Sequence, residues 1–174
     1  MKRIVFIACL LLSCLAMHGV VTTSHVFNST DPANKIVSFA GSYKQATMTD
    51  GTLYTCSEGA SFASGPGGVC ISLPSSGIVV VSPARQGLRS FTIRHTSNTV
   101  TMDIWVSTDG STWTPATDLG TRNNTNGAIE ITGLNGNYFV KFRNTTGPAF
   151  YVTEMDYQTE QEPESCRCLR VVVN

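Results

Sequence analysis

Apolar and polar residues alternate with a period of two along much of the chain, and the alternation is sharpest between residues 89 and 107. In the first such run, RSFTIRHT, the apolar face carries Phe91, Ile93 and His95. The second run, NTVTMDIWVST, has one apolar face and one face carrying Thr101, Asp103, Trp105 and Ser107. Because successive side chains of a strand point to opposite faces, each run predicts a strand with one buried face.

Turn signals punctuate these strands. Asp109-Gly110 predicts a hairpin after the second run, since both residue types tolerate the positive φ angles of tight hairpin turns. Asn135-Gly136 predicts another hairpin inside GAIEITGLNGNYFVKFRNT. Further strands are predicted at residues 35–39, on either side of PSSG, and in AFYVTEMDYQ. Short strands with turns every ~8–12 residues, and no helical period beyond the N-terminal segment, indicate an all-β sandwich or barrel.

The two ends of the chain depart from this pattern. Met1-Lys2-Arg3 and the apolar run that follows predict a secretory signal, which is too short for the ~20 apolar residues of a membrane span. We therefore assign residues 1–24 to the signal peptide, 25–158 to the β domain and 159–174 to a C-terminal tail. The expected location is secreted or on the outer cell surface, extracellular or periplasmic, with no transmembrane segment.

The cleavage point of the signal has two interpretations. LLSC resembles a bacterial lipobox, in which Cys14 is acylated and becomes the new N-terminus of a lipoprotein. Ordinary cleavage is the alternative, around Thr22 to Ser24, where small residues gather. A single acyl chain anchors a protein only weakly by itself. The sequence leaves both interpretations open.

Four of the six cysteines lie outside the signal, and an even number in an oxidising compartment predicts disulfides. Cys56 with Cys70 is the preferred pair, and a closed loop of about 15 residues stabilises a fold by roughly 3 kcal/mol. Cys166 and Cys168 form a CxC sequence in the tail. That sequence is a local disulfide, half of a metal site, or two thiols that pair elsewhere.

Charge and motifs exclude several classes of function. Without Lys2 and Arg3, the 12 basic residues fall to 10 against 12 acidic ones, and no Lys/Arg run occurs, which argues against nucleic acid as a partner. No nucleophile elbow, metal-binding His pair or phosphate-binding glycine loop is present in the sequence. The carboxylates that could act in pairs are scattered along the chain: Asp103, Glu130, Glu154 and Asp156. The chain is therefore predicted not to be an enzyme.

Trp105 is the principal candidate for contact with a ligand. It falls on the polar face of its strand beside Asp103, and Arg94 lies on the polar face of the preceding strand, where it could lie opposite Trp105. An aromatic ring with a few convergent polar groups is typical of small-molecule sites, including sugar sites. The competing interpretation is that Trp105 only covers the outer face of a central strand. Trp113 follows a tight turn and is predicted to pack on the end of the sheet.

The segment SFTIRHTSNTVTMDIWVSTDGSTWTPATDL, followed by ITGLNGNYFVKFRNTTGPAFYVTEMDYQ, resembles galactose-binding-like (jelly-roll) β-sandwich modules. It is most similar to the carbohydrate-binding modules attached to secreted bacterial pectate lyases, and the resemblance covers residues 35–158. It implies two antiparallel sheets, a sugar site on end loops or a concave face, and often a structural calcium ion near the chain termini. Asp156 matches the acidic residue of the family's last strand and is the calcium candidate. Only Asp31 and Asp50 could join it from the N-terminal side, although calcium needs six or more oxygen ligands.

These observations predict a secreted or surface-anchored, non-catalytic carbohydrate-binding module. Its expected partner is a glycan or polysaccharide, bound through Trp105, Asp103 and Arg94. The alternative is a structural or adhesion protein of the cell surface that binds another protein, with the tail around Cys166 and Cys168 as the interacting or cross-linking element.

Overall fold

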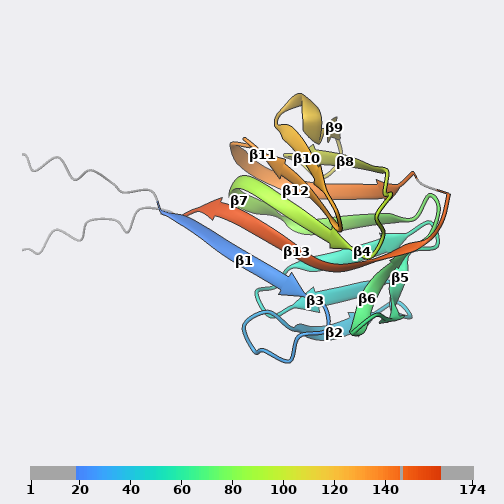
Figure 1. Cartoon of the computed structure of the whole chain (residues 1–174). Coiled ribbons are helices and arrows are strands. Elements are labelled where there is room, and N and C mark those ends of the chain that lie inside the picture. The colour runs from blue at the N-terminus through green and yellow to red at the C-terminus, as the bar shows by residue number, and fades with distance from the viewer. Residues whose placement is uncertain (1–18, 146, 162–174) are drawn as a thin grey trace, which may run out of the picture.

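The structure, a computed structural model, describes residues 19–145 and 147–161 (Figure 1). The described chain consists mainly of β-strands joined by turns and loops, and no helix in it is long and apolar enough to cross a membrane. The elements are β1 (Val20–Val26), β2 (Ile36–Ala40), β3 (Gln45–Met48), β4 (Leu53–Ser57), β5 (Ser61–Gly65), β6 (Gly68–Leu73), β7 (Ile78–His95), β8 (Met102–Ser107), β9 (Thr114–Pro115), the 3-10 helix η1 (Ala116–Asp118), β10 (Thr121–Thr125), β11 (Ala128–Thr132), β12 (Gly136–Asn144) and β13 (Phe150–Glu160).

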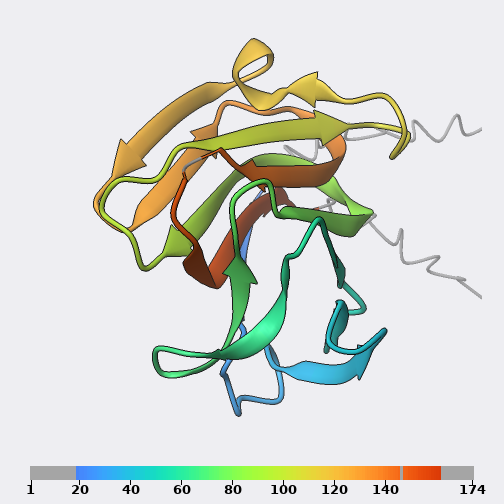
Figure 2. The same cartoon turned by 90° about the vertical axis from the view of Figure 1, so that its right-hand side faces the viewer.

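Hydrogen bonds join the strands into an antiparallel sheet that does not close and that folds into two layers. The first layer has the order β2-β3-β4-β7-β12-β8-β9. The second has the order β10-β11-β7-β13, with β1 and the β5–β6 hairpin paired along β13. This arrangement confirms the predicted all-β antiparallel sandwich. In Figure 2 the β8 to β11 segment lies at the top and the β2–β3 hairpin at the bottom, so these elements occupy opposite ends of the molecule.

Strand β7 belongs to both layers. Its first residues, from Ile78 to Ser82, pair with β4, and Ile78 to Leu88 pair with β12. Its last residues pair with β11 and β13. The two parts meet at Leu88, which pairs with both β12 and β13, and the preceding Gly87 has a φ of 58° that is unfavourable for residues with a Cβ. The sequence suggested separate strands around VVV and RSFTIRHT, but the structure joins them into one strand of 18 residues.

The core lies between the layers and is filled by the apolar face of each strand. On β7, Phe91 and Ile93 are buried as the alternation predicts, and on β8 so are Ile104 and Val106. The unbroken run at the start of β7 also alternates, with Val79 and Val81 buried and their neighbours half-buried. Burial of such side chains contributes about 1.5–3 kcal/mol each, which makes this core the main source of stability.

The hairpin predicted at Asn135-Gly136 is wrong. Strand β11 pairs with β10 and with the second part of β7, whereas β12 pairs with β8 and along the first part of β7 as far as Leu88. The connection at Gly133 to Asn135 therefore crosses from one layer to the other. The hairpin at Asp109-Gly110 does form, because β8 pairs with the short strand β9.

The predicted disulfide between Cys56 and Cys70 is also wrong, since both are free, buried thiols. Cys56 lies in the core, where burial raises the pKa of its thiol to about 12. Cys70 lies on the face of β6 opposite to Ile71, which is a core residue, and its Sγ is 3.6 Å from the carbonyl oxygen of Pro66. Cys56 therefore lies on the core side of β6, whereas the Cys70 side chain points to the opposite side of that strand. Cys14, Cys166 and Cys168 lie outside the described residues.

The described chain begins and ends at the same edge of the molecule (Figure 1). Seven residues of β1 pair with β13, from Val20 opposite Glu160 to Val26 opposite Glu154. The amide of Gln161 donates to the carbonyl of Gly19 at 2.8 Å, just beyond the last pair. The sheet therefore includes Val20 to Ser24, which the sequence assigned to the signal peptide.

Candidate functional site

The outer face of the first layer carries Trp105. Strand β8 places this residue between Lys141 of β12 and Pro115 of β9, its neighbours in the pairing register. The side chain points away from the core because Ile104 and Val106 take the inward positions. Trp105 is half-buried, so it is neither a core residue nor a fully open platform.

Two cations from β12 cover the Trp105 ring. The Lys141 ammonium lies 4.7 Å from the ring centroid of Trp105 and 4.3 Å from that of Trp113, so it sits against both tryptophans of the chain. The Arg143 guanidinium lies 5.6 Å from the Trp105 ring and donates to Asp103 at 2.8 Å. Burial and the nearby Arg143 charge lower the pKa of Lys141. Trp113, in the loop between β8 and β9, therefore packs against the Lys141 side chain of β12.

A hollow of about 330 Å³ opens beside Trp105 on the side of β9 and η1. That volume is near the lower end of the range for ligand pockets, roughly 300–1,000 Å³. It has an aromatic wall from Trp105 and polar groups from three further side chains, so it combines the features expected of a small polar ligand site. The residues lining the hollow are Asp103, Ile104, Trp105, Pro115, Thr117, Arg122 and Ile131.

Arg122 is held in place at the rim of this hollow. Its Nη1 donates to the carbonyl of Met102 at 2.6 Å, and its Nε donates to Oδ1 of Asn124 at 2.8 Å. These bonds use two of the five N–H groups of the guanidinium and fix its orientation. Burial lowers the pKa of Arg122, while the Asp103 carboxylate acts in the opposite direction.

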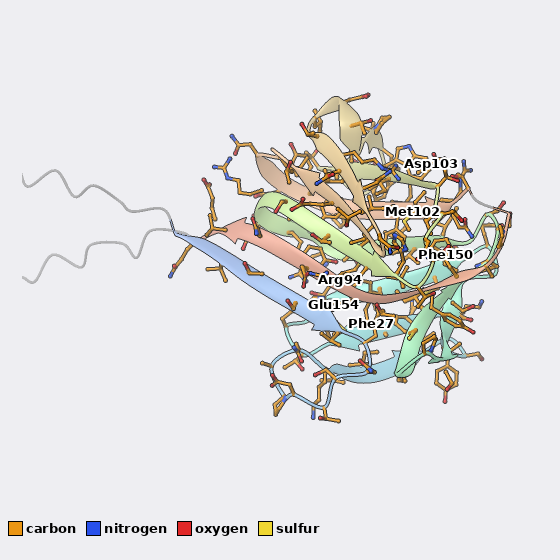
Figure 3. All side chains as sticks on the ribbon, viewed as in Figure 1. Phe27, Arg94, Met102, Asp103, Phe150 and Glu154 are labelled. Atoms are coloured by element: carbon orange, nitrogen blue, oxygen red, sulfur yellow. The ribbon has the colours of Figure 1, made fainter. Side chains whose placement is uncertain are left out.

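Arg94 lies elsewhere. On β7 it is opposite Glu154 of β13 and Ala128 of β11, on the outer face of the second layer. Figure 3 shows Arg94 beside Glu154 and well away from Asp103. Of the three residues predicted to bind a ligand together, the structure brings Trp105 and Asp103 to one hollow and leaves Arg94 on the other face.

The outer face of the second layer is a polar trough of about 410 Å³. Asp156 accepts from Ser24 at 2.6 Å and from Nη2 of Arg94 at 3.0 Å, and Glu154 lies 3.6 Å from Arg94. Burial and the neighbouring Asp156 raise the pKa of Glu154. The lining includes three of the four scattered carboxylates, namely Glu130, Glu154 and Asp156.

Although Glu130 and Glu154 line the same trough as Asp156, the arrangement does not support the predicted calcium site. The part of the chain that the structure describes has no group of three His, Cys, Asp or Glu side chains that could hold a metal ion. Asp156 is instead paired with Arg94, and neither Asp31 nor Asp50 lines the trough. A calcium ion at Asp156 stays a prediction.

The comparisons with known proteins add no family. No protein-family model and no curated protein matches the chain. The resemblance to galactose-binding-like modules therefore stays a prediction, and the case for a function depends on the geometry of these surfaces.

A buried polar network lies apart from both faces and links the two layers. His25 of β1 is 1% exposed, and its Nδ1 lies 2.7 Å from the hydroxyl of Tyr54. Its Nε2 lies 3.1 Å from Oδ2 of Asp50, which also accepts from Nη1 of Arg85 at 2.9 Å. The Arg85 guanidinium lies 4.4 Å from the ring centroid of Tyr157. No motif in the sequence singles out His25, the first residue of the predicted β domain.

Burial sets the titration of this network. It lowers the pKa of His25, although the Asp50 carboxylate acts in the opposite direction. It would raise the pKa of Asp50, but hydrogen bonds from Thr52 and Arg85 outweigh it and hold that pKa well below its usual range. Burial also raises the pKa of Tyr157 to about 12. At neutral pH the network therefore contains a neutral imidazole next to a carboxylate–guanidinium pair.

Acidification from pH 7.5 to 5 is expected to destabilise the fold through His25. The unfolded histidine titrates near 6.5 and the folded one below that, so between these values the unfolded state binds more protons and stability falls as pH falls. His95, whose pKa burial also lowers, acts in the same direction. Urea unfolding across this pH range measures the effect. His25→Gln should flatten the dependence, and an unchanged slope in that variant would rule out His25 as its source.

An exposed aromatic patch lies at the other end of the molecule, on the β2–β3 hairpin. Phe39 is 41% and Tyr43 59% exposed, and their ring centroids are 5.2 Å apart. With Phe62 and Val69 they line an apolar hollow of about 570 Å³. Exposed apolar patches of this kind often mark interaction sites.

The sequence missed several of these residues for different reasons. Lys141 and Arg143 follow from the alternation in NYFVKFRN, in which Val140 and Phe142 point inward. Arg122 could not be found in this way, because TRNNT has no apolar face to reveal a strand. Its position beside Trp105 depends on the path of the chain through η1 and β10.

Proposed function

We propose that this protein is a non-catalytic carbohydrate-binding module, secreted or held at the outer cell surface, whose sugar lies in the hollow beside Trp105. The observation that carries the proposal is the convergence on this hollow of a half-buried indole, the Asp103 carboxylate, the oriented Arg122 guanidinium and the Thr117 hydroxyl. An aromatic face packs against the C–H groups of a sugar, while the polar groups exchange hydrogen bonds with its hydroxyls.

The chemistry of the hollow favours binding over catalysis. Its one carboxylate, Asp103, accepts a hydrogen bond from Arg143 and lies near Arg122, an arrangement that suits it to accept hydrogen bonds from the hydroxyls of a ligand. A general acid and base would need two titratable groups facing one ligand. Asp103 is the one titratable carboxyl among the described residues lining the hollow.

Affinity electrophoresis through gels containing a panel of soluble pectic and host polysaccharides tests the proposal. At least one polymer is expected to retard the wild-type protein, and Trp105→Ala should weaken that binding roughly 10- to 30-fold, as the loss of an aromatic anchor does. Tyr43→Ala is the matched control, since it removes an exposed aromatic ring from the β2–β3 hairpin, which lies at the opposite end of the molecule (Figure 2). If no polymer retards the wild type, or if Trp105→Ala is retarded equally, the proposal is wrong.

Binding of another protein is the second candidate, and the aromatic patch of Phe39 and Tyr43 favours it. A second copy of this chain is the partner that the purified protein can test directly. A dimer in solution that Phe39→Ser converts to a monomer, measured by light scattering, would support this role. A monomer at all concentrations would contradict it.

A further inference from the structure

Positive charge collects around Trp105 although the chain as a whole is balanced. Of the 12 basic residues, Lys2, Arg3, Arg167 and Arg170 lie outside the described residues, which leaves eight described cations against ten described carboxylates. Three of these eight belong to the Trp105 face, and we call them the basic cluster: Arg122, Lys141 and Arg143. Asp103, which pairs with Arg143, is the one carboxylate among the described residues that line the hollow.

Within the basic cluster, positive charges outnumber the carboxylates that pair with them. Elsewhere Arg85, Arg89 and Arg94 each form an ion pair with at least one carboxylate, and Lys35 and Lys44 stand as single unpaired cations among the described residues. In the basic cluster only Arg143 does so, with Asp103 at 2.8 Å. Neither Arg122 nor Lys141 forms an ion pair with any residue that the structure describes. The site therefore holds two positive charges that the protein itself does not balance.

The position of these charges matters as much as their number. Lys141 is held against two indole rings, and Arg122 is fixed by its bonds to Met102 and Asn124. Both cations are partly withdrawn from water, Lys141 at 4.7 Å from the Trp105 ring centroid and Arg122 in the lining of the hollow, and less of their charge is screened there than at an open surface. An anionic group on the ligand would also relieve the repulsion between Lys141 and Arg143.

We infer that the saccharide bound at the Trp105 hollow carries an acidic group, a carboxylate or a sulfate, which Arg122 contacts from the lining of the hollow and which Lys141 attracts from the β12 side of the Trp105 ring. This inference rests on the proposed function and names its ligand class. The indole supplies contact with the sugar ring, and the two unpaired cations supply the preference for an acidic sugar over a neutral one of the same shape. Lys141 and Arg122 are then the specificity-determining residues of the site.

Polygalacturonate and the same polymer after reduction of its carboxyl groups form the matched pair of probes for the uronate form, and dextran sulfate and dextran form the pair for the sulfate form. In one pair or the other, the wild type should bind the acidic polymer about tenfold more tightly than its neutral partner, and added salt should reduce this preference. Lys141→Met should remove most of it. Lys35→Met, which removes the same charge from the residue before β2, should leave it unchanged, because the β2–β3 hairpin lies at the opposite end of the molecule (Figure 2). Trp105→Ala should weaken binding of the acidic polymer itself.

The outcomes separate this inference from the proposed function. Equal binding of the acidic and neutral members of both pairs, or binding of neutral polymers alone, overturns the inference and leaves the carbohydrate-binding role intact. Failure of every polysaccharide in the wider panel overturns the role itself. Equal competition by polyglutamate, a polyanion without sugar rings, overturns the inference because the site would then be a plain anion surface. The wild-type comparison needs no variant, so it holds even if Lys141→Met folds poorly.

Discussion

Replacing Asp50 with alanine is expected to lower the free energy of unfolding by about 3 kcal/mol, because it leaves charged and polar groups buried without their partner. The Asp50 carboxylate accepts four hydrogen bonds: from the amide and hydroxyl of Thr52, from Nη1 of Arg85 and from Nε2 of His25. Without it, Arg85 keeps its charge in a site where its side chain is only 16% exposed. Urea denaturation at pH 7.5 measures the loss.

Asp118→Ala serves as the comparison, since Asp118 is an exposed acidic residue of η1 and should change stability by no more than about 0.5 kcal/mol. Adding Arg85→Met to Asp50→Ala should recover part of the loss, because it replaces the unpaired charge with an apolar chain of similar length. A loss below about 1 kcal/mol in the single variant, or a further loss in the double variant, would show that the ion pair contributes little.

The sequence predicts those features of the fold that depend on residues close together along the chain, and it does not predict which distant strands pair. Alternation acts within one strand, and it placed Phe91, Ile93, Ile104 and Val106 correctly in the core. It also placed Trp105 and Arg94 correctly on outer faces. Alternation carries no information on which layer a strand joins. The prediction that Arg94 lies opposite Trp105 is therefore wrong, although each residue was placed on the correct face of its own strand.

The same limit explains the two other errors. Asn135-Gly136 has the composition of a hairpin turn, but β11 and β12 follow different parts of β7, so the turn connects two layers instead of two paired strands. Cys56 and Cys70 are separated along the chain by a distance suitable for a disulfide. On β6, however, Ile71 and Leu73 point into the core, so the alternation of side chains directs Cys70 away from it. The His25 network joins residues from β1, the β3–β4 turn, β4 and β7, and no local pattern predicts that meeting.

A chain that begins at His25 is expected to be much less stable than one that begins at Gly19, so cleavage of the predicted signal is expected at or before Gly19 and not around Thr22 to Ser24. Cleavage before His25 would remove five of the seven paired residues of β1 and the hydrogen bond from Ser24 to Asp156. It would also place a new ammonium group on a residue that is 1% exposed, with Nη2 of Arg85 3.2 Å from its ring. Burying a second positive charge there is strongly unfavourable.

The intact mass of the exported protein gives the cleavage point directly. A mass that begins at Cys14 with added acyl chains would support the lipoprotein interpretation, and an unmodified start between that residue and Gly19 would support ordinary cleavage at an earlier position than the sequence suggested. Unfolding of two purified chains, one starting at Gly19 and one at His25, supplies the energetic test. The longer chain should be more stable by about 3 kcal/mol or more, at roughly 1 kcal/mol for each net hydrogen bond lost. An exported protein that starts at His25 and is as stable as the longer chain would show that the first half of β1 is dispensable.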